Sequence, residues 1–113
     1  MNERVNILGT EYTITIATEE EDKRLKECDG YCDWTVKRIV VCEFEPDRDS
    51  WIDLEAYKKK VLRHEIVHAF FFECGLHESS AEVNAWAKNE EMVDWIARQY
   101  VKLYKAFEEA GAL

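Results

Sequence analysis

The spacing of hydrophobic residues changes near the middle of the chain, from every second position to every third or fourth. In residues 12–17 large apolar side chains alternate with threonine and alanine, which predicts a half-buried strand. Residues 29–44 predict a β-hairpin that opens at Asp29-Gly30 and has the β-branched run 36–41 as its second strand. Between them, the mostly charged residues 19–27 predict a helical turn or loop at the surface.

The second half of the chain has the pattern of long helices. From residue 54 to residue 74 apolar side chains form two rows at helical spacing, which predicts a helix at the centre of the core. Ser50 or Asp53 can cap its start, and Gly75 can end it. A second long helix is predicted between residues 89 and 111, with an apolar face made of Met92, Val93, Ile96, Tyr100, Leu103 and Phe107.

Strands followed by helices predict an α+β domain. We expect residues 1–113 to form one domain, with residues 1–49 mainly in strands and residues 50–113 mainly in helices. The predicted strands are antiparallel and pack on the central helix. A hydrophobic content of 47% and an aromatic content of 12% are those of a folded protein with one core.

The net charge and the cysteines indicate which partners the protein can bind and in which compartment it lies. With 24 acidic and 15 basic residues the net charge is −9, which argues against nucleic acids and anionic membranes as partners. No apolar run has the length of a signal peptide or a membrane span, so we expect a cytoplasmic protein. The four cysteines lack the two closely spaced pairs of a zinc ribbon and predict mostly buried or half-buried free thiols.

Candidate chemistry appears in the first long helix, in His64-Glu65-Ile66-Val67-His68. Residues four apart on a helix share one face, so both imidazoles can bind one zinc ion. Glu65 would then lie beside a water in an open coordination position and could take its proton. A chance match is expected on the order of once per hundred such chains. The alternative, a buried helix whose histidines bind carbonyl groups, therefore stays open.

A third ligand is needed, because two histidines hold zinc poorly. The extended motif that supplies a third histidine is absent, but Glu90 follows His68 by 22 residues and Asp94 lies one turn later. If the two long helices pack together, Glu90 can bind the ion and Asp94 can accept a hydrogen bond from a ligating histidine. Glu91 remains a rival ligand, because one step along a helix rotates a side chain by about 100°.

These motifs carry a family resemblance. HEIVH followed by NEEMVD resembles the glutamate zincins, whose pattern is H-E-x-x-H, a spacer and N-E-x-x-x-D. The segment EEMVDWIA is similar to E-x-x-A-[ND]-x-F-A of the ImmA/IrrE group, small metallopeptidases common in phages and mobile elements. Val93 stands where that group has alanine.

The resemblance implies a minimal zincin-like domain in the cytoplasm of a bacterial host or phage-infected cell. It implies zinc on His64, His68 and Glu90, Glu65 as the general base, and Asp94 as the partner of a ligand.

The leading hypothesis is a zinc-dependent metallopeptidase that hydrolyses peptide bonds in a peptide or protein. The resemblance implies a regulatory protein as the substrate, and we expect an extended peptide to add to the sheet edge along residues 36–44. No residue matches an oxyanion-stabilising group, which supports an alternative, a zinc-stabilised binding or regulatory module without catalysis. His77 could supply such a group, but a surface-loop histidine is the preferred interpretation. A metal-free interaction domain is the third hypothesis.

Overall fold

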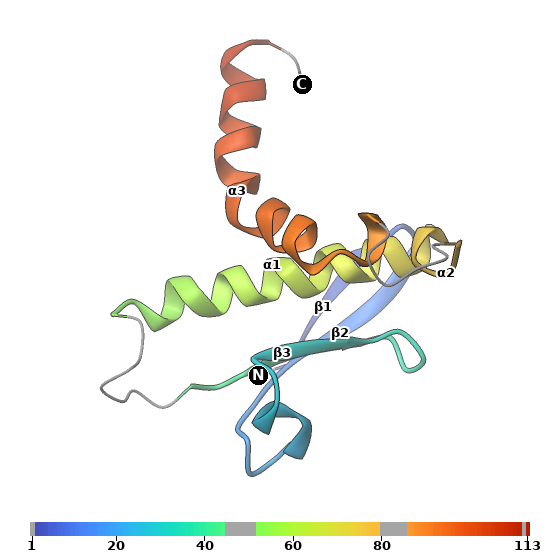
Figure 1. The fold of residues 1–113 in the computed structure, drawn as a ribbon, viewed down its shortest axis with the longest axis vertical. Helices are drawn as coiled ribbons and strands as arrows, with labels where there is room; N and C mark the ends of the chain where they lie inside the picture. Colours follow the sequence, from blue (N-terminus) through green and yellow to red (C-terminus); the bar gives the residue numbers. More distant parts are fainter. Residues whose placement is uncertain (1, 45–51, 80–85, 112) are drawn as a thin grey trace.

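Four strands form one mixed β-sheet in the N-terminal half of the chain, as the computed structural model shows (Figure 1). The structure describes residues 2–44, 52–79, 86–111 and 113. The strands lie in the order β1-β2-β4-β3. Their bounds are Asn2–Ile7 for β1, Thr10–Ala17 for β2, Gly30–Asp33 for β3 and Arg38–Cys42 for β4.

Two hairpins build the sheet, and the strands that join them are parallel. β1 pairs with β2, and β3 with β4, in antiparallel fashion, whereas β2 pairs with β4 in parallel. The prediction of antiparallel strands is therefore wrong for this central pair. The connection of residues 18–29 crosses to the far edge of the sheet before β3 begins, so β4 returns in the direction of β2.

The interior position of β4 overturns a second prediction. Both sides of β4 are paired, one with β2 and one with β3, so residues 38–42 offer no edge to a peptide. The predicted peptide-binding edge along residues 36–44 is wrong, because the sheet ends at β3. The hairpin itself is confirmed. The charged segment between β2 and β3 contains the short 3-10 helix η1, Lys23–Lys26, as the predicted surface turn requires.

β1 has no counterpart among the predicted elements. Only Val5 and Ile7 in this strand are apolar, which is too short an alternation to detect. β1 turns into β2 through Leu8 and Gly9, whose φ angles of 52° and 92° are those of a two-residue hairpin turn.

The sheet buries side chains on both faces. Tyr12 and Ile14 of β2 and Ile39 of β4 lie in a core cluster with Val61 and Ala69 of the first long helix. On the other face, a smaller cluster is formed by Ala17, Leu25, Val40 and Cys42. Because both faces of β4 are covered, all four residues 39–42 are buried.

The first long helix, α1, spans Leu54–Glu73, as the sequence predicts. Asp53 caps its start by accepting a hydrogen bond from the backbone N–H of Ala56, at 3.0 Å; the other candidate cap, Ser50, lies outside the described residues. At the other end Glu73 accepts hydrogen bonds from Tyr12, at 2.6 Å, and Lys37, at 2.8 Å. These contacts fix the C-terminal end of α1 on the sheet.

Short helices connect α1 to the second long helix. They are α2, Leu76–Ser79, and the 3-10 helix η2, Trp86–Lys88. α3 spans Glu90–Glu109, close to the predicted bounds. Its first part crosses α1, and its second part extends away from the rest of the molecule (Figure 1). Within the described part of the chain, no helix combines the length and the apolar character that crossing a bilayer requires.

Gly30 lets β3 approach α1 closely. A Cβ atom at this position would lie 2.8 Å from the Val40 carbonyl oxygen and 2.9 Å from Cγ1 of Val61. We expect Gly30→Ala to lower the free energy of unfolding by about 1–3 kcal/mol, because backbone must move to relieve the contact. Denaturant unfolding measures this loss. Unchanged stability would show that β3 and α1 do not lie this close.

Candidate metal centre

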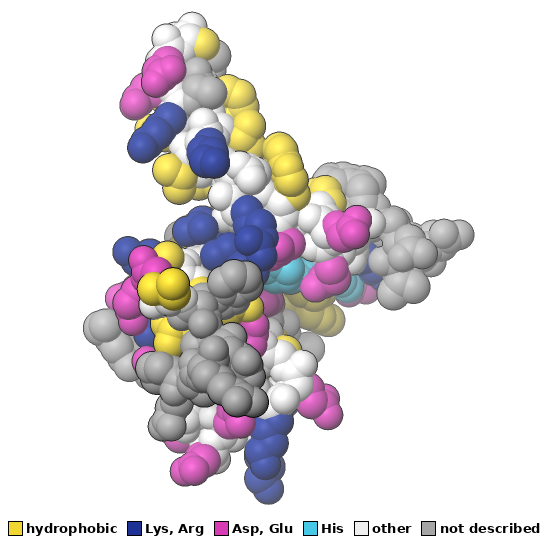
Figure 2. Space-filling view, turned by 60° about the vertical axis from the view of Figure 1, so that its left-hand side comes forward, with side chains coloured by type: hydrophobic (Ala, Val, Ile, Leu, Met, Phe, Trp, Pro, Cys, Tyr) yellow, Lys and Arg dark blue, Asp and Glu magenta, His cyan; other side chains and the backbone are white. Residues whose placement is uncertain are grey.

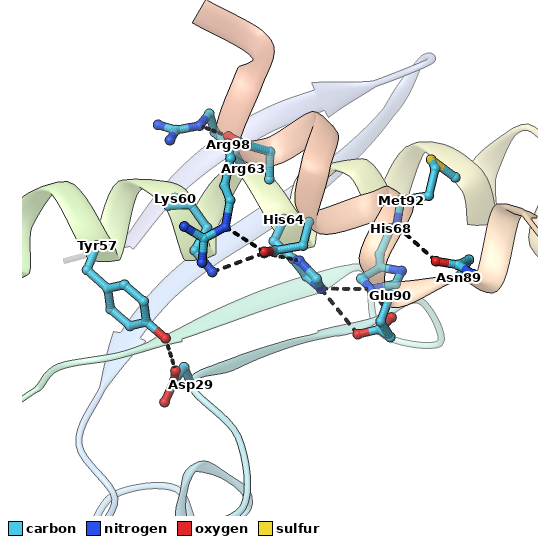
Figure 3. A network of polar contacts seen from close by, with 12 residues as sticks. Asp29, Tyr57, Lys60, Arg63, His64, His68, Asn89, Glu90, Met92 and Arg98 are labelled. Atoms are coloured by element: carbon cyan, nitrogen blue, oxygen red, sulfur yellow. Dashed lines mark hydrogen bonds and ion pairs between the residues drawn. The ribbon is translucent and has the colours of Figure 1, made fainter. Parts of the chain in front are cut away.

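Two histidines of α1 and the first residue of α3 point toward one another (Figure 3). Nε2 of His68 lies 2.8 Å from Oε1 of Glu90, and Nε2 of His64 lies 3.3 Å from Oε2 of the same carboxylate. The two Nε2 atoms are 3.1 Å apart. Among the described residues, these three form the group of His, Cys, Asp or Glu side chains that could hold a metal ion, with ligand atoms within 4.8 Å of one another.

The donor set and its spacing fit zinc. Two donors about 2.05 Å from one tetrahedral zinc ion are about 3.3 Å apart, close to the separations found between these side chains. Two nitrogens and one carboxylate oxygen are the protein ligands of many catalytic zinc sites, which keep a fourth position for water. The predicted set of His64, His68 and Glu90 therefore meets in space.

Asn89 places Glu90 at the histidines. Its side-chain oxygen accepts a hydrogen bond from the backbone N–H of Met92, at 2.9 Å, and this N-cap starts α3 directly at Glu90. The cap therefore fixes the start of α3, and the packing of α3 on α1 turns Glu90 toward the histidines. Glu91, the rival ligand, is exposed and lies outside the metal-binding group.

Asp94 contacts the ring nitrogen of His64 that faces away from Glu90. Its Oδ1 lies 3.2 Å from Nδ1 of His64 and 3.0 Å from Nζ of Lys60, and its Oδ2 lies 2.7 Å from Nε of Arg98. Burial raises the pKa of Asp94, but the hydrogen bonds from Arg98 and Lys60 outweigh this effect and lower it to about 2. An ionised Asp94 favours the proton of His64 on Nδ1, which leaves Nε2 free to bind an ion.

Glu65 lies on the buried side of α1, next to these ligands. It is 7% exposed, and burial, with repulsion from Glu90, raises its pKa to about 8, although Lys60 opposes the shift. Burial also lowers the pKa of His68, which favours the neutral ring that a metal ligand needs. Glu65 is therefore suited to proton transfer near neutral pH.

His64, Glu65, Glu90 and Asp94 line an open pocket of about 200 Å³. One wall is the loop that leads into β3, Cys28, Asp29 and Gly30, and the rest comes from α1 and α3. In Figure 2 the histidine side chains lie among acidic and basic groups at the surface. The pocket therefore gives solvent access to the candidate metal site.

The structure adds two polar residues that the sequence analysis did not identify as site residues. Tyr57 and Lys60 line the pocket, and the Tyr57 hydroxyl donates to Asp29. Both precede His64 at helical spacing, by seven and four residues, so their position on the same face could have been read from the sequence.

Other candidates lie outside the metal-binding group. His77 lies in α2, and its ring packs on Phe72 at a centroid distance of 4.1 Å. The expectation of mostly buried or half-buried cysteines is wrong for Cys28 and Cys74, which are exposed. Cys32 and Cys42 are half-buried and buried, and all four cysteines are free.

Comparisons with protein-family models, curated proteins and solved structures find no match to this chain.

Proposed function

We propose that the protein is a zinc-dependent metallopeptidase of zincin-like fold. His64, His68 and Glu90 would hold the ion, and Glu65 would be the general base. One observation carries the proposal: the ligand atoms of three side chains from two helices lie within 4.8 Å of one another, and two of these side chains, His64 and Glu90, line a pocket together with the buried Glu65. A two-histidine, one-carboxylate set beside a protonatable carboxylate is the arrangement that hydrolytic zinc sites use.

Each side chain has a separate task in the reaction. When bound, zinc would activate a water and polarise the scissile carbonyl. Glu65 takes a proton from the attacking water as the C–O bond forms, and it gives that proton to the leaving amine as the C–N bond breaks. Asp94 holds His64 in the tautomer that binds through Nε2. Lys60 and Tyr57 lie in the same pocket as candidate donors to the substrate oxygen.

The substrate would be an extended peptide or protein segment bound along β3. This strand is one of the two edges of the sheet, and its first residue, Gly30, lines the pocket. A peptide that pairs with β3 would gain backbone hydrogen bonds with little sequence preference. A regulatory protein in the cytoplasm of a bacterial host or phage-infected cell is the substrate that the resemblance to the ImmA/IrrE group suggests.

One observation favours the alternative of a zinc-stabilised binding module without catalysis. The two pocket donors are engaged, Lys60 with Asp94 and Tyr57 with Asp29. A transition state would have to compete with these carboxylates for the donors. Activity, not zinc content, separates the two functions.

The test is cleavage of a complex peptide mixture by zinc-loaded protein, followed by mass spectrometry of the new termini. We expect new termini that disappear with a zinc chelator and return when zinc is restored. A mixture cut equally by zinc-loaded and zinc-free protein, or by neither, would contradict the peptidase proposal.

A further inference from the structure

Three side chains, Trp34, Phe72 and His77, form an aromatic cluster at the C-terminal end of α1. The rings of Trp34 and Phe72 are stacked with centroids 6.1 Å apart, and the ring of His77 packs on Phe72 at 4.1 Å. Phe72 follows His68 by four residues on α1, so it lies one turn beyond this ligand on the same face. The aromatic cluster is therefore a neighbour of the candidate metal centre.

β3 leads from the pocket to the aromatic cluster. At its start, Gly30 lines the pocket, and a Cβ atom there would lie 2.9 Å from Cγ1 of Val61. Trp34 follows the last residue of β3 and stacks on Phe72. The strand covers about 13 Å between Gly30 and Trp34, and the helix covers about 16 Å between Val61 and Phe72. Strand and helix therefore run side by side in the same direction, with the two histidine ligands between their ends (Figure 1).

The outer edge of β3 offers backbone groups to a peptide along this line. The N–H of Cys42 donates to the carbonyl of Asp29, at 2.8 Å, in the antiparallel pairing of β3 with β4. Every second residue from Asp29 onward therefore directs its backbone groups toward β4, and Gly30 and Cys32 direct theirs away from it. A peptide that pairs with these outer groups passes the metal centre and continues toward the aromatic cluster.

The position of the aromatic cluster makes a side chain of such a peptide its occupant. From His68 to Phe72 the helix advances about 6 Å, which an extended peptide covers in about two residues. A side chain within two positions of the scissile bond therefore reaches the aromatic cluster. Trp34 is 44% exposed, so its ring keeps surface for this contact.

The chemistry at the two ends of β3 indicates the kind of side chain that fits. At the pocket end a peptide meets charged groups, among them Asp29 and Lys60. At the other end it meets rings, and the ammonium group of Lys37, 5.7 Å from the Trp34 ring, is paired with Glu73 at 2.8 Å. An aromatic side chain gains contact area and ring stacking there. A charged side chain would lose hydration, because Lys37 and Glu73 already pair with each other.

We propose that the aromatic cluster is a subsite for an aromatic side chain of a peptide bound along β3, and that the protein selects peptides with such a residue within two positions of the scissile bond. This inference rests on the proposed function in one respect, that a peptide binds along β3 beside the ion. It does not require hydrolysis. Pocket contacts of this kind distinguish a large from a small side chain by about 10–100-fold.

Phosphinic tetrapeptides test the subsite, because their phosphinate group binds zinc and cannot be hydrolysed. An all-alanine probe is compared with four probes that each carry one phenylalanine, at successive positions, by titration calorimetry on the zinc-loaded chain. We expect one of the phenylalanine probes to bind with a dissociation constant about 10–100-fold lower than that of the all-alanine probe.

Variants of Trp34 assign this preference to the aromatic cluster. Trp34→Ala should abolish the difference between the two probes, whereas Trp34→Phe should retain most of it, because a ring remains to stack on. The matched control is Tyr104→Ala. Tyr104 is 44% exposed, as Trp34 is, and lies on the part of α3 that extends away from the rest of the molecule (Figure 1), so the difference should persist.

The outcomes separate this inference from the proposed function. Equal affinity for every probe, or binding of none, would overturn the subsite, as would a preference that survives in Trp34→Ala. Selective binding of the phenylalanine probe without cleavage of the matching peptide would overturn the peptidase and support the subsite in a binding module. Cleavage without any preference for an aromatic residue would support the peptidase and overturn the subsite.

Discussion

Glu65→Gln is expected to lower the rate of peptide hydrolysis by about 10²–10⁴-fold while zinc stays bound, because an amide cannot accept the proton of the attacking water. Glu65 lies outside the group of ligand atoms, so its replacement leaves His64, His68 and Glu90 in place. Glutamine has nearly the same shape as glutamate and is neutral. It therefore fits the buried position without the cost of desolvating a charge.

The same variant has a second expected effect, on the stability of the zinc-free protein. The pKa of Glu65 is raised to about 8 in the folded chain, above its ordinary value of 4.5. The folded state therefore holds a proton that the unfolded state releases as the pH rises from about 4.5 to 8, and the wild type loses stability across this window. Glu65→Gln removes this loss, so the variant should be the more stable of the two at pH 8.

The first effect is measured by zinc content and by peptide cleavage. The second is measured by thermal unfolding at pH 5 and pH 8 in the presence of a chelator. Glu91→Gln is the matched control, because it neutralises an exposed glutamate outside the metal-binding group. Cleavage that survives in Glu65→Gln would remove Glu65 from the mechanism. Loss of zinc in this variant would mean that Glu65 binds or supports the ion.

Glu90→Ala is expected to weaken zinc binding by more than about a hundredfold, whereas Glu91→Ala should leave it nearly unchanged. The two oxygens of Glu90 lie 2.8 and 3.3 Å from the two ring nitrogens, so its removal takes away the third donor. Groups that only support a ligand already contribute 10–100-fold to metal affinity, so a ligand should contribute more. Competition with a chromophoric zinc chelator measures the difference. The reverse pattern for the two glutamates would reassign the third ligand.

The long helices and the histidine pair of the metal-binding group were predictable because their signals are local. The N-cap at Asp53, the apolar rows of α1 and Gly75 fix the first helix. Spacing of four residues places His64 and His68 on one face of it. The sequence also identified the pair Glu90 and Asp94, because these residues lie one turn apart at the start of the second helix.

The choice between Glu90 and Glu91 depended on tertiary structure. A shift of one residue in the start of α3 would turn the other glutamate toward the histidines. The cap formed by Asn89 fixes the start, but only the crossing of α1 and α3 shows which glutamate meets the imidazoles. A cap in the sequence predicts where a helix starts and therefore which residues share a face. It does not predict which element that face packs against.

Local sequence patterns did not predict β1 or the direction in which β2 and β4 pair. β1 contributes only Val5 and Ile7 as apolar residues, and its pairing with β2 supplies the rest of its stability. The parallel pairing of β2 with β4 joins residues about 25 positions apart, such as Thr13 and Arg38. Strand alternation gives the buried face of each strand and carries no information on its neighbour or direction.

In the proposed function, His64, His68 and Glu90 bind one zinc ion. The most direct test is elemental analysis of the folded wild-type protein after incubation with zinc and extensive dialysis. We predict one zinc per chain. A folded protein that retains no zinc would contradict the claim, and the catalytic role of Glu65 with it.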